Sequence, residues 1–201
     1  AWIWPGYATV IGINTCREAR KKDHDNWASN VWSDIKADCK GNVTNTFYHA
    51  GMITSDAIAW NAPNDDHPAR AASQRSYSAV AKGDLAEWLT VYAEDAVLED
   101  PVGRSMFDPE GRGHRGHAGL SAFWEKAIAP IATFEFEITD SFANPGSNTC
   151  ANVGRIRTAF PDGSHTTTDL IMVYVVGDDG RVTSMKAYWE PERTMATLTK
   201  G

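Results

Sequence analysis

The chain has 201 residues, of which 42% are hydrophobic and 22% are charged, a composition typical of globular proteins and not of disordered or fibrous ones. Its 26 acidic and 19 basic residues give a net charge of −7, which argues against electrostatic binding to nucleic acid. The sequence contains no apolar run that could span a bilayer and no signal-peptide pattern, so we expect a cytoplasmic protein without nucleic-acid or membrane partners.

The composition changes near Met52. Residues 1–51 hold five acidic and six basic residues, no leucine and four of the eight tryptophans, whereas residues 52–201 hold 21 acidic and 13 basic residues. We therefore expect an extension at 1–51 and a separate domain at 52–201, which is an ordinary domain length. Two origins are open for the extension: sequence upstream of a start at Met52, or a poorly packed natural extension.

The first half of the domain predicts helices. Asp66 is expected to cap a helix that has Pro68 in its first turn, runs to Lys82 and stops at Gly83. A second helix follows, with Asp84 as its cap in a capping-box pattern. Its inward face is expected to carry four residues at helical spacing, namely Leu85, Trp88, Leu89 and Tyr92.

Strands dominate the second half. A short strand at 96–100 ends at Pro101, and a third helix is expected near 117–127. Apolar alternation then predicts four further strands, joined by turns rich in glycine and aspartate, at residues 133–142, 149–160, 164–176 and 181–190. Helices followed by a run of antiparallel strands favour an α+β fold with the helices on one face of a curved sheet.

Asp100 is the first candidate for chemistry. Alternation in its strand places it on the same face as Ala96 and Leu98, at a strand end where a pocket could open. A carboxylate that loses hydration there has a raised pKa and accepts a proton more readily near neutral pH. The alternative is that Asp100 only caps the turn begun by Pro101, because aspartate before proline is common in turns.

Several stretches resemble the bacterial Δ5-3-ketosteroid isomerases over about residues 70–190. These stretches are Gly83–Leu85, Tyr92–Ala96, Glu99–Gly103 and Gly180–Trp189. The resemblance implies the cone-shaped, nuclear-transport-factor-2-like (SnoaL-like) fold, in which N-terminal helices pack on a curved mixed or antiparallel sheet around an apolar pocket. It also implies a homodimer that needs no cofactor and no metal.

The resemblance assigns Asp100 the role of the general base that moves a proton between two carbons of a steroid ketone. The family's oxyanion hole uses a tyrosine of the first helix and a protonated aspartate of a later strand. Counting from neighbouring motifs puts Ser76 and Met172 at these two positions. Tyr77 is one residue away, about 100° around the helix, and Asp169 alternates onto the opposite strand face if that strand is regular.

Other side chains are expected to replace the missing donors or to contact the ligand. Tyr92 lies where some of these isomerases also carry a tyrosine, so we take Asp100, Tyr77 and Tyr92 as the catalytic candidates. Plain core packing is the alternative for each aromatic residue. The expected ligand contacts are Trp88, Phe123, Trp124, Met172 and Trp189.

Three functions fit this sequence. The first is an isomerase that shifts a double bond in a 3-ketosteroid or a similar apolar ketone. The second is another reaction on the same scaffold, such as a cyclase or dehydratase that uses Asp100 as a base. The third is a non-catalytic binder of apolar small molecules. The retained Asp100 favours the first two, whereas the loss of both donor positions favours the last two.

Overall fold

The computed structural model describes residues 54, 55 and 57–201. The predicted boundary between residues 51 and 52 lies outside this part of the chain. Within it, no helix is long and apolar enough to cross a membrane.

The first long helix, α3, spans Pro68–Lys82. Gly83 ends it in the left-handed conformation at φ 68°, where its N–H donates to the carbonyl of Val80. The cap at the start of the helix is His67, whose side chain makes no capping bond, so the expectation of Asp66 was wrong. Pro68 decides this end, because proline favours the first helical position and makes the residue before it the cap.

The second helix, α4, covers Leu85–Val91, and the side chain of Asp84 accepts the N–H of Glu87 at 2.8 Å, as the capping pattern predicts. The helix ends one residue before Tyr92, which is extended and begins strand β3, Tyr92–Glu99. The strand therefore starts four residues earlier than expected. Pairing between Tyr92 and Val182 sets this start, and the register then shifts before Val97.

One sheet contains all the strands of the described residues. Its order is β1-β2-β5-β6-β7-β8-β3-β4, with β2–β5 and β3–β8 parallel and the other pairs antiparallel. The strands not yet given are β1 (Thr54–Ser55), β2 (Ile58–Trp60), β4 (His114–Arg115), β5 (Thr133–Ala143), β6 (Thr149–Ala159), β7 (His165–Val176) and β8 (Val182–Tyr188).

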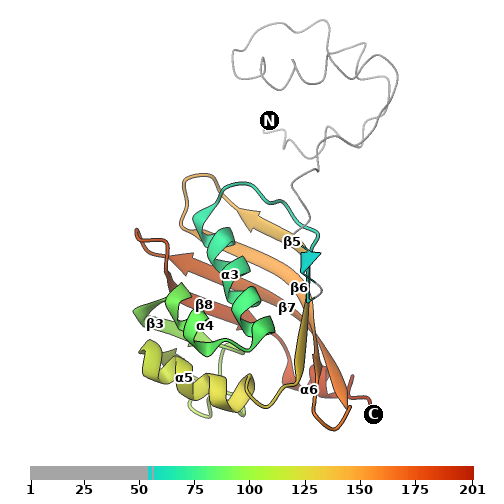
Figure 1. The fold of residues 1–201 in the computed structure, drawn as a ribbon. Coiled ribbons are helices and arrows are strands. Elements are labelled where there is room, and N and C mark those ends of the chain that lie inside the picture. The colour runs from blue at the N-terminus through green and yellow to red at the C-terminus, as the bar shows by residue number, and fades with distance from the viewer. Residues whose placement is uncertain (1–53, 56) are drawn as a thin grey trace, which may run out of the picture. The chain divides into compact units, whose positions relative to one another are not determined.

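The helices cover one face of this curved, mixed and unclosed sheet (Figure 1). Helix α3 packs against β5, β6 and β7, and α5, Gly116–Ala127, packs against β3. A short helix that the sequence did not predict, α6, spans Pro191–Met195 and contacts β7. The α+β prediction is confirmed, and the buried core lies between the helices and the concave face of the sheet.

Candidate active site

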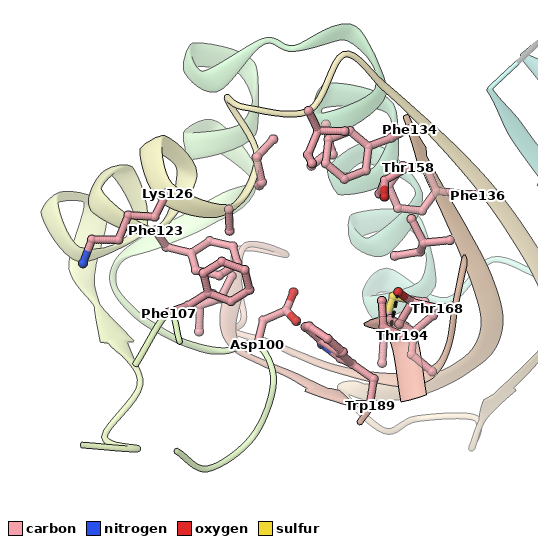
Figure 2. A pocket seen from close by; sticks show the side chains of 18 of the residues that line it. Asp100, Phe107, Phe123, Lys126, Phe134, Phe136, Thr158, Thr168, Trp189 and Thr194 are labelled. Carbon is pink, nitrogen blue, oxygen red and sulfur yellow. Dashed lines mark hydrogen bonds between the residues drawn. The ribbon is translucent and has the colours of Figure 1, made fainter. Parts of the chain in front are cut away.

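An apolar cavity of about 330 Å³ lies in this core, within the size range of small-molecule sites. Helices α3, α4, α5 and α6 and strands β3 and β5 to β8 all contribute to its lining. The aromatic rings of Phe107, Phe123 and Phe134 are among those that border it, and Asp100 projects into it (Figure 2). Most of the lining surface is apolar, as in sites for apolar ligands.

Asp100 follows the last residue of β3. Leu98 lines the cavity with it, whereas Glu99 between them binds Lys186 in an ion pair at 3.0 Å. The indole N–H of Trp189 donates to Oδ1 of Asp100 at 2.6 Å. Burial raises the pKa of the Asp100 carboxyl to about 6, and the bond from Trp189 opposes that rise because it stabilises the ionised form. Asp100 is thus ionised at neutral pH and has a higher proton affinity than an ordinary aspartate.

A cluster of hydroxyl groups lies deeper in the cavity lining, formed by Ser76, Tyr77, Tyr92 and Tyr174. All four residues are buried, and the hydroxyls of Ser76 and Tyr92 are 3.2 Å apart. The indole N–H of Trp88 donates to the Ser76 oxygen at 3.0 Å. Burial raises the pKa of all three tyrosines, so their phenols stay protonated and can donate hydrogen bonds.

Asn152 orients one of these phenols. Its amide nitrogen donates to the Tyr77 oxygen and to the Ser73 hydroxyl, each at 2.9 Å. Its own oxygen accepts from Ser141 at 2.7 Å, and Ser141 in turn accepts from Nε of the buried Arg70 at 2.9 Å. Because the Tyr77 oxygen accepts from Asn152, the Tyr77 hydrogen is directed away from that amide.

The two positions at which the family carries its oxyanion donors both line the cavity. Ser76 accepts the Trp88 N–H and its hydroxyl is 3.2 Å from that of Tyr92, whereas Met172 has no hydrogen to donate. Asp169 is exposed on the outer face of β7, where it pairs with Arg155 at 2.8 Å. The strand alternation predicted this orientation of Asp169.

Four of the five expected ligand contacts line the cavity: Trp88, Phe123, Met172 and Trp189. Trp124 does not. Its ring packs against that of Trp88, with centroids 5.2 Å apart, on the side away from the cavity. The reason is helical rotation: Phe123 faces the cavity, so the next residue points about 100° away.

Sequence reasoning missed Tyr174, four threonines and helix α6 as parts of the lining. For Tyr174 a signal existed, because it alternates with Leu170 and Met172 on one face of β7, and all three line the cavity. The alternating Phe134 and Phe136 gave the same signal for β5. No local sequence pattern predicted α6, because the helix is only five residues long.

Among residues 54, 55 and 57–201, no group of three His, Cys, Asp or Glu side chains is placed to hold a metal ion. His117 is not part of the cavity lining, and its Nε2 atom is 3.1 Å from the carbonyl oxygen of Tyr92.

Comparisons with known proteins agree with this geometry. The family model of the SnoaL-like domain matches residues 73–185. A steroid Delta-isomerase from Nocardioides simplex is 30% identical over 128 residues, which cover 64% of this chain and 94% of that enzyme.

Solved structures give the same result. The Δ5-3-ketosteroid isomerase from a Mycobacterium species superposes with a TM-score of 0.60 at 33% identity, covering 67% of this chain and 99% of its own. A Mycobacterium tuberculosis protein in complex with estradiol-17β-hemisuccinate also has a TM-score of 0.60, at 28% identity and 67% and 99% coverage. The chain therefore has the nuclear-transport-factor-2-like fold of ketosteroid isomerases.

Proposed function

Because the chain belongs to the SnoaL-like domain family and is similar to steroid isomerases, we propose that it shifts a carbon–carbon double bond in a 3-ketosteroid or a similar apolar ketone. The observation that carries the proposal is the Asp100 carboxylate, held at the wall of an apolar cavity with its pKa raised to about 6. A base with a pKa near the working pH combines a large ionised fraction with a useful proton affinity.

In the proposed reaction, the Asp100 carboxylate removes a proton from the carbon between the ketone and the double bond. The electron pair of that C–H bond moves toward the ketone oxygen and forms a dienolate. The neutral Asp100 carboxyl then returns the proton to the far carbon of the dienolate. The ketone oxygen loses its negative charge, and the double bond comes into conjugation with the carbonyl.

The hydroxyl cluster supports the charged intermediate in this proposal. We assign Tyr77 and Tyr92 as donors to the ketone oxygen, with Tyr174 as a third donor. Each phenol is neutral, and the bond from Asn152 to the Tyr77 oxygen directs the Tyr77 hydrogen away from that amide. Pre-oriented donors in a water-poor site stabilise a developing oxyanion strongly, each typically by a factor of about 10² to 10³ in kcat.

The test is Asp100→Asn, assayed with a β,γ-unsaturated 3-ketosteroid and by equilibrium binding of the conjugated product. Asparagine keeps the size and polarity of the side chain but cannot accept the proton. We expect turnover to fall by about 10² to 10⁴-fold while product affinity stays within threefold, because binding depends mainly on apolar contact area. Equal turnover in wild type and variant would refute Asp100 as the base.

A non-catalytic binder is the second candidate. It is favoured by the two positions that lack the family's donors, Ser76 and Met172. Tight steroid binding by the wild-type chain, with no turnover of any β,γ-unsaturated ketone, would support this function over the isomerase.

A further inference from the structure

The cavity has a second polar region, formed by Thr158, Thr166, Thr168 and Thr194, which we call the threonine cluster. Two of its members, Thr166 and Thr168, lie near the start of β7, whereas Tyr174 lies near the end of the same strand. The cavity-lining residues of that strand follow the order Thr166, Thr168, Leu170, Met172 and Tyr174. Six residues separate Thr168 from Tyr174, which corresponds to about 20 Å of extended strand.

The strand register places Asp100 between these two polar regions. Glu99 pairs with Lys186, so Asp100 lies level with Ala187, which pairs with Met172 of β7. Thr168 is four residues from Met172, or about 13 Å along the strand. The lining between them is apolar and includes Leu170 and Ile156. The cavity thus alternates polar, apolar and polar surface along its length.

The threonine hydroxyls bond to one another in two pairs. The Oγ1 atoms of Thr158 and Thr166, which are cross-strand partners, are 2.7 Å apart. Thr194 of α6 donates to Thr168 at 3.1 Å, and Figure 2 shows these two side chains together. Each pair uses one hydroxyl hydrogen and leaves another available, together with free lone pairs. Thr166 is only 5% exposed, whereas Thr158, Thr168 and Thr194 are half-buried, so the cluster is a partly buried section of the cavity wall.

We propose that the threonine cluster is a subsite for a second oxygen of the ligand, a hydroxyl or carbonyl at the end remote from the reacting ketone. The preferred substrate is then a rigid apolar ketone with oxygen at both ends, and not a hydrocarbon body with one carbonyl. This inference rests on the proposed function, because the ketone must lie against the tyrosines for the other end to reach the cluster.

The test compares two matched ligands by isothermal titration calorimetry on the full chain. One is a conjugated 3-ketosteroid with a 17β-hydroxyl, and the other is the same steroid with hydrogen at carbon 17. One neutral hydrogen bond that replaces bonds to water predicts about threefold to tenfold tighter binding of the hydroxylated steroid. Equal affinities in the wild-type chain would overturn the subsite and leave the isomerase proposal intact.

Single substitutions test whether the preference for the hydroxylated steroid arises at the threonine cluster. Thr168→Val and, separately, Thr158→Val keep the side-chain shape but remove the hydroxyl. We expect each to reduce the preference for the hydroxylated steroid at least threefold while affinity for the deoxy steroid stays within twofold, which also shows that the variant is folded. The matched control is Thr167→Val, on the same strand but outside the cavity lining, which should keep the wild-type preference.

The remaining outcomes are also decisive. A preference that survives in both threonine variants would overturn the assignment of the threonine cluster. If neither steroid binds the wild-type chain and no isomerisation is detected, both the proposed function and the subsite are overturned.

Discussion

At the residue scale, two opposing effects, burial and a hydrogen bond, set the proton affinity of Asp100. Burial in an apolar cavity disfavours the carboxylate, while the 2.6 Å bond from Trp189 favours it. The resulting pKa of about 6 keeps the group ionised at neutral pH but ready to accept a proton. For the proposed reaction, kcat/KM should therefore fall as the pH decreases through about 6, because protonated Asp100 cannot act as a base.

Trp189→Phe removes the contact that lowers this pKa. The pKa of Asp100 should then rise, and the inflection of kcat/KM should move to higher pH by about one to two units, the equivalent of one hydrogen bond to a charged group. A pH–rate profile measures this shift. Trp124→Phe is the control, because Trp124 packs outside the cavity and should leave the inflection in place. An unshifted profile in Trp189→Phe would mean that the indole does not stabilise the carboxylate.

Tyr77→Phe tests the proposed donor whose oxygen accepts from Asn152. We expect kcat to fall about 10² to 10³-fold, with product affinity changed little, because the bond strengthens as charge develops on the ketone oxygen. The control is Tyr188→Phe, since Tyr188 is half exposed on the outer face of the sheet. If kcat of Tyr77→Phe equals that of the control, Tyr77 is not an oxyanion donor.

Counting residues around helix α3 predicted the positions of Ser76 and Tyr77 on the helix but not which of them faces the cavity. It placed Ser76 at the family's tyrosine position and Tyr77 on a different side of the helix. Both nevertheless line the cavity, because the concave sheet and α4 border α3 on two sides. Ser76 bonds to Trp88 of α4, while Tyr77 stacks on Phe136 of β5 with centroids 5.0 Å apart.

At the element scale, the sequence predicted the long elements well because their ends carry local chemistry. Gly83 and Asp84 determine the end of α3 and the start of α4. The start of β3 could not be predicted, since it depends on the pairing of Tyr92 with Val182, 90 residues further along the chain. Short elements such as β1, β2 and α6 are too brief to show a period.

Gly154 of β6 lies in close contact with the neighbouring strand β5. A β-carbon there would lie 2.5 Å from the carbonyl oxygen of Glu137 and 2.9 Å from Cδ1 of Ile138. The register of β5 against β6 shifts immediately after Ile138, so this contact lies at the bend of the sheet that shapes the cavity.

Gly154→Ala should therefore destabilise the fold by about 1 to 3 kcal/mol, because backbone must move to make room. Thermal unfolding measures the effect as a lower Tm. The matched control is Gly177→Ala, where the nearest atoms are side-chain atoms of Asp179 and Thr183 at 3.4 Å and no strain is expected. Equal Tm values for the two variants would show that the strands tolerate the added carbon.

At the scale of the whole molecule, we propose that residues 52–201 fold and function without the preceding segment. The charge and leucine content change at Met52, and the SnoaL-like match lies entirely within residues 73–185. The similar enzyme from Nocardioides simplex matches over 94% of its own length with only 128 residues aligned. We therefore expect residues 52–201 to be sufficient for an isomerase-like domain.

A protein that begins at Met52 should keep its Tm within a few degrees of the full chain and retain the same kcat/KM. Differential scanning calorimetry and a steady-state assay, run side by side on both proteins, make the comparison. A large drop in Tm or insolubility of the shorter protein would show that residues 1–51 contribute to the stability of the domain.

The bond between Trp189 and Asp100 also has an optical consequence. Indole emission responds to the charge of a group in direct contact with its N–H, so protonation of Asp100 should change the fluorescence of Trp189. Titrating the ligand-free protein should then give an emission step with a midpoint near pH 6, and Asp100→Asn should abolish that step. The protein would thereby carry its own indicator of the protonation state of its proposed base, readable before any substrate is known.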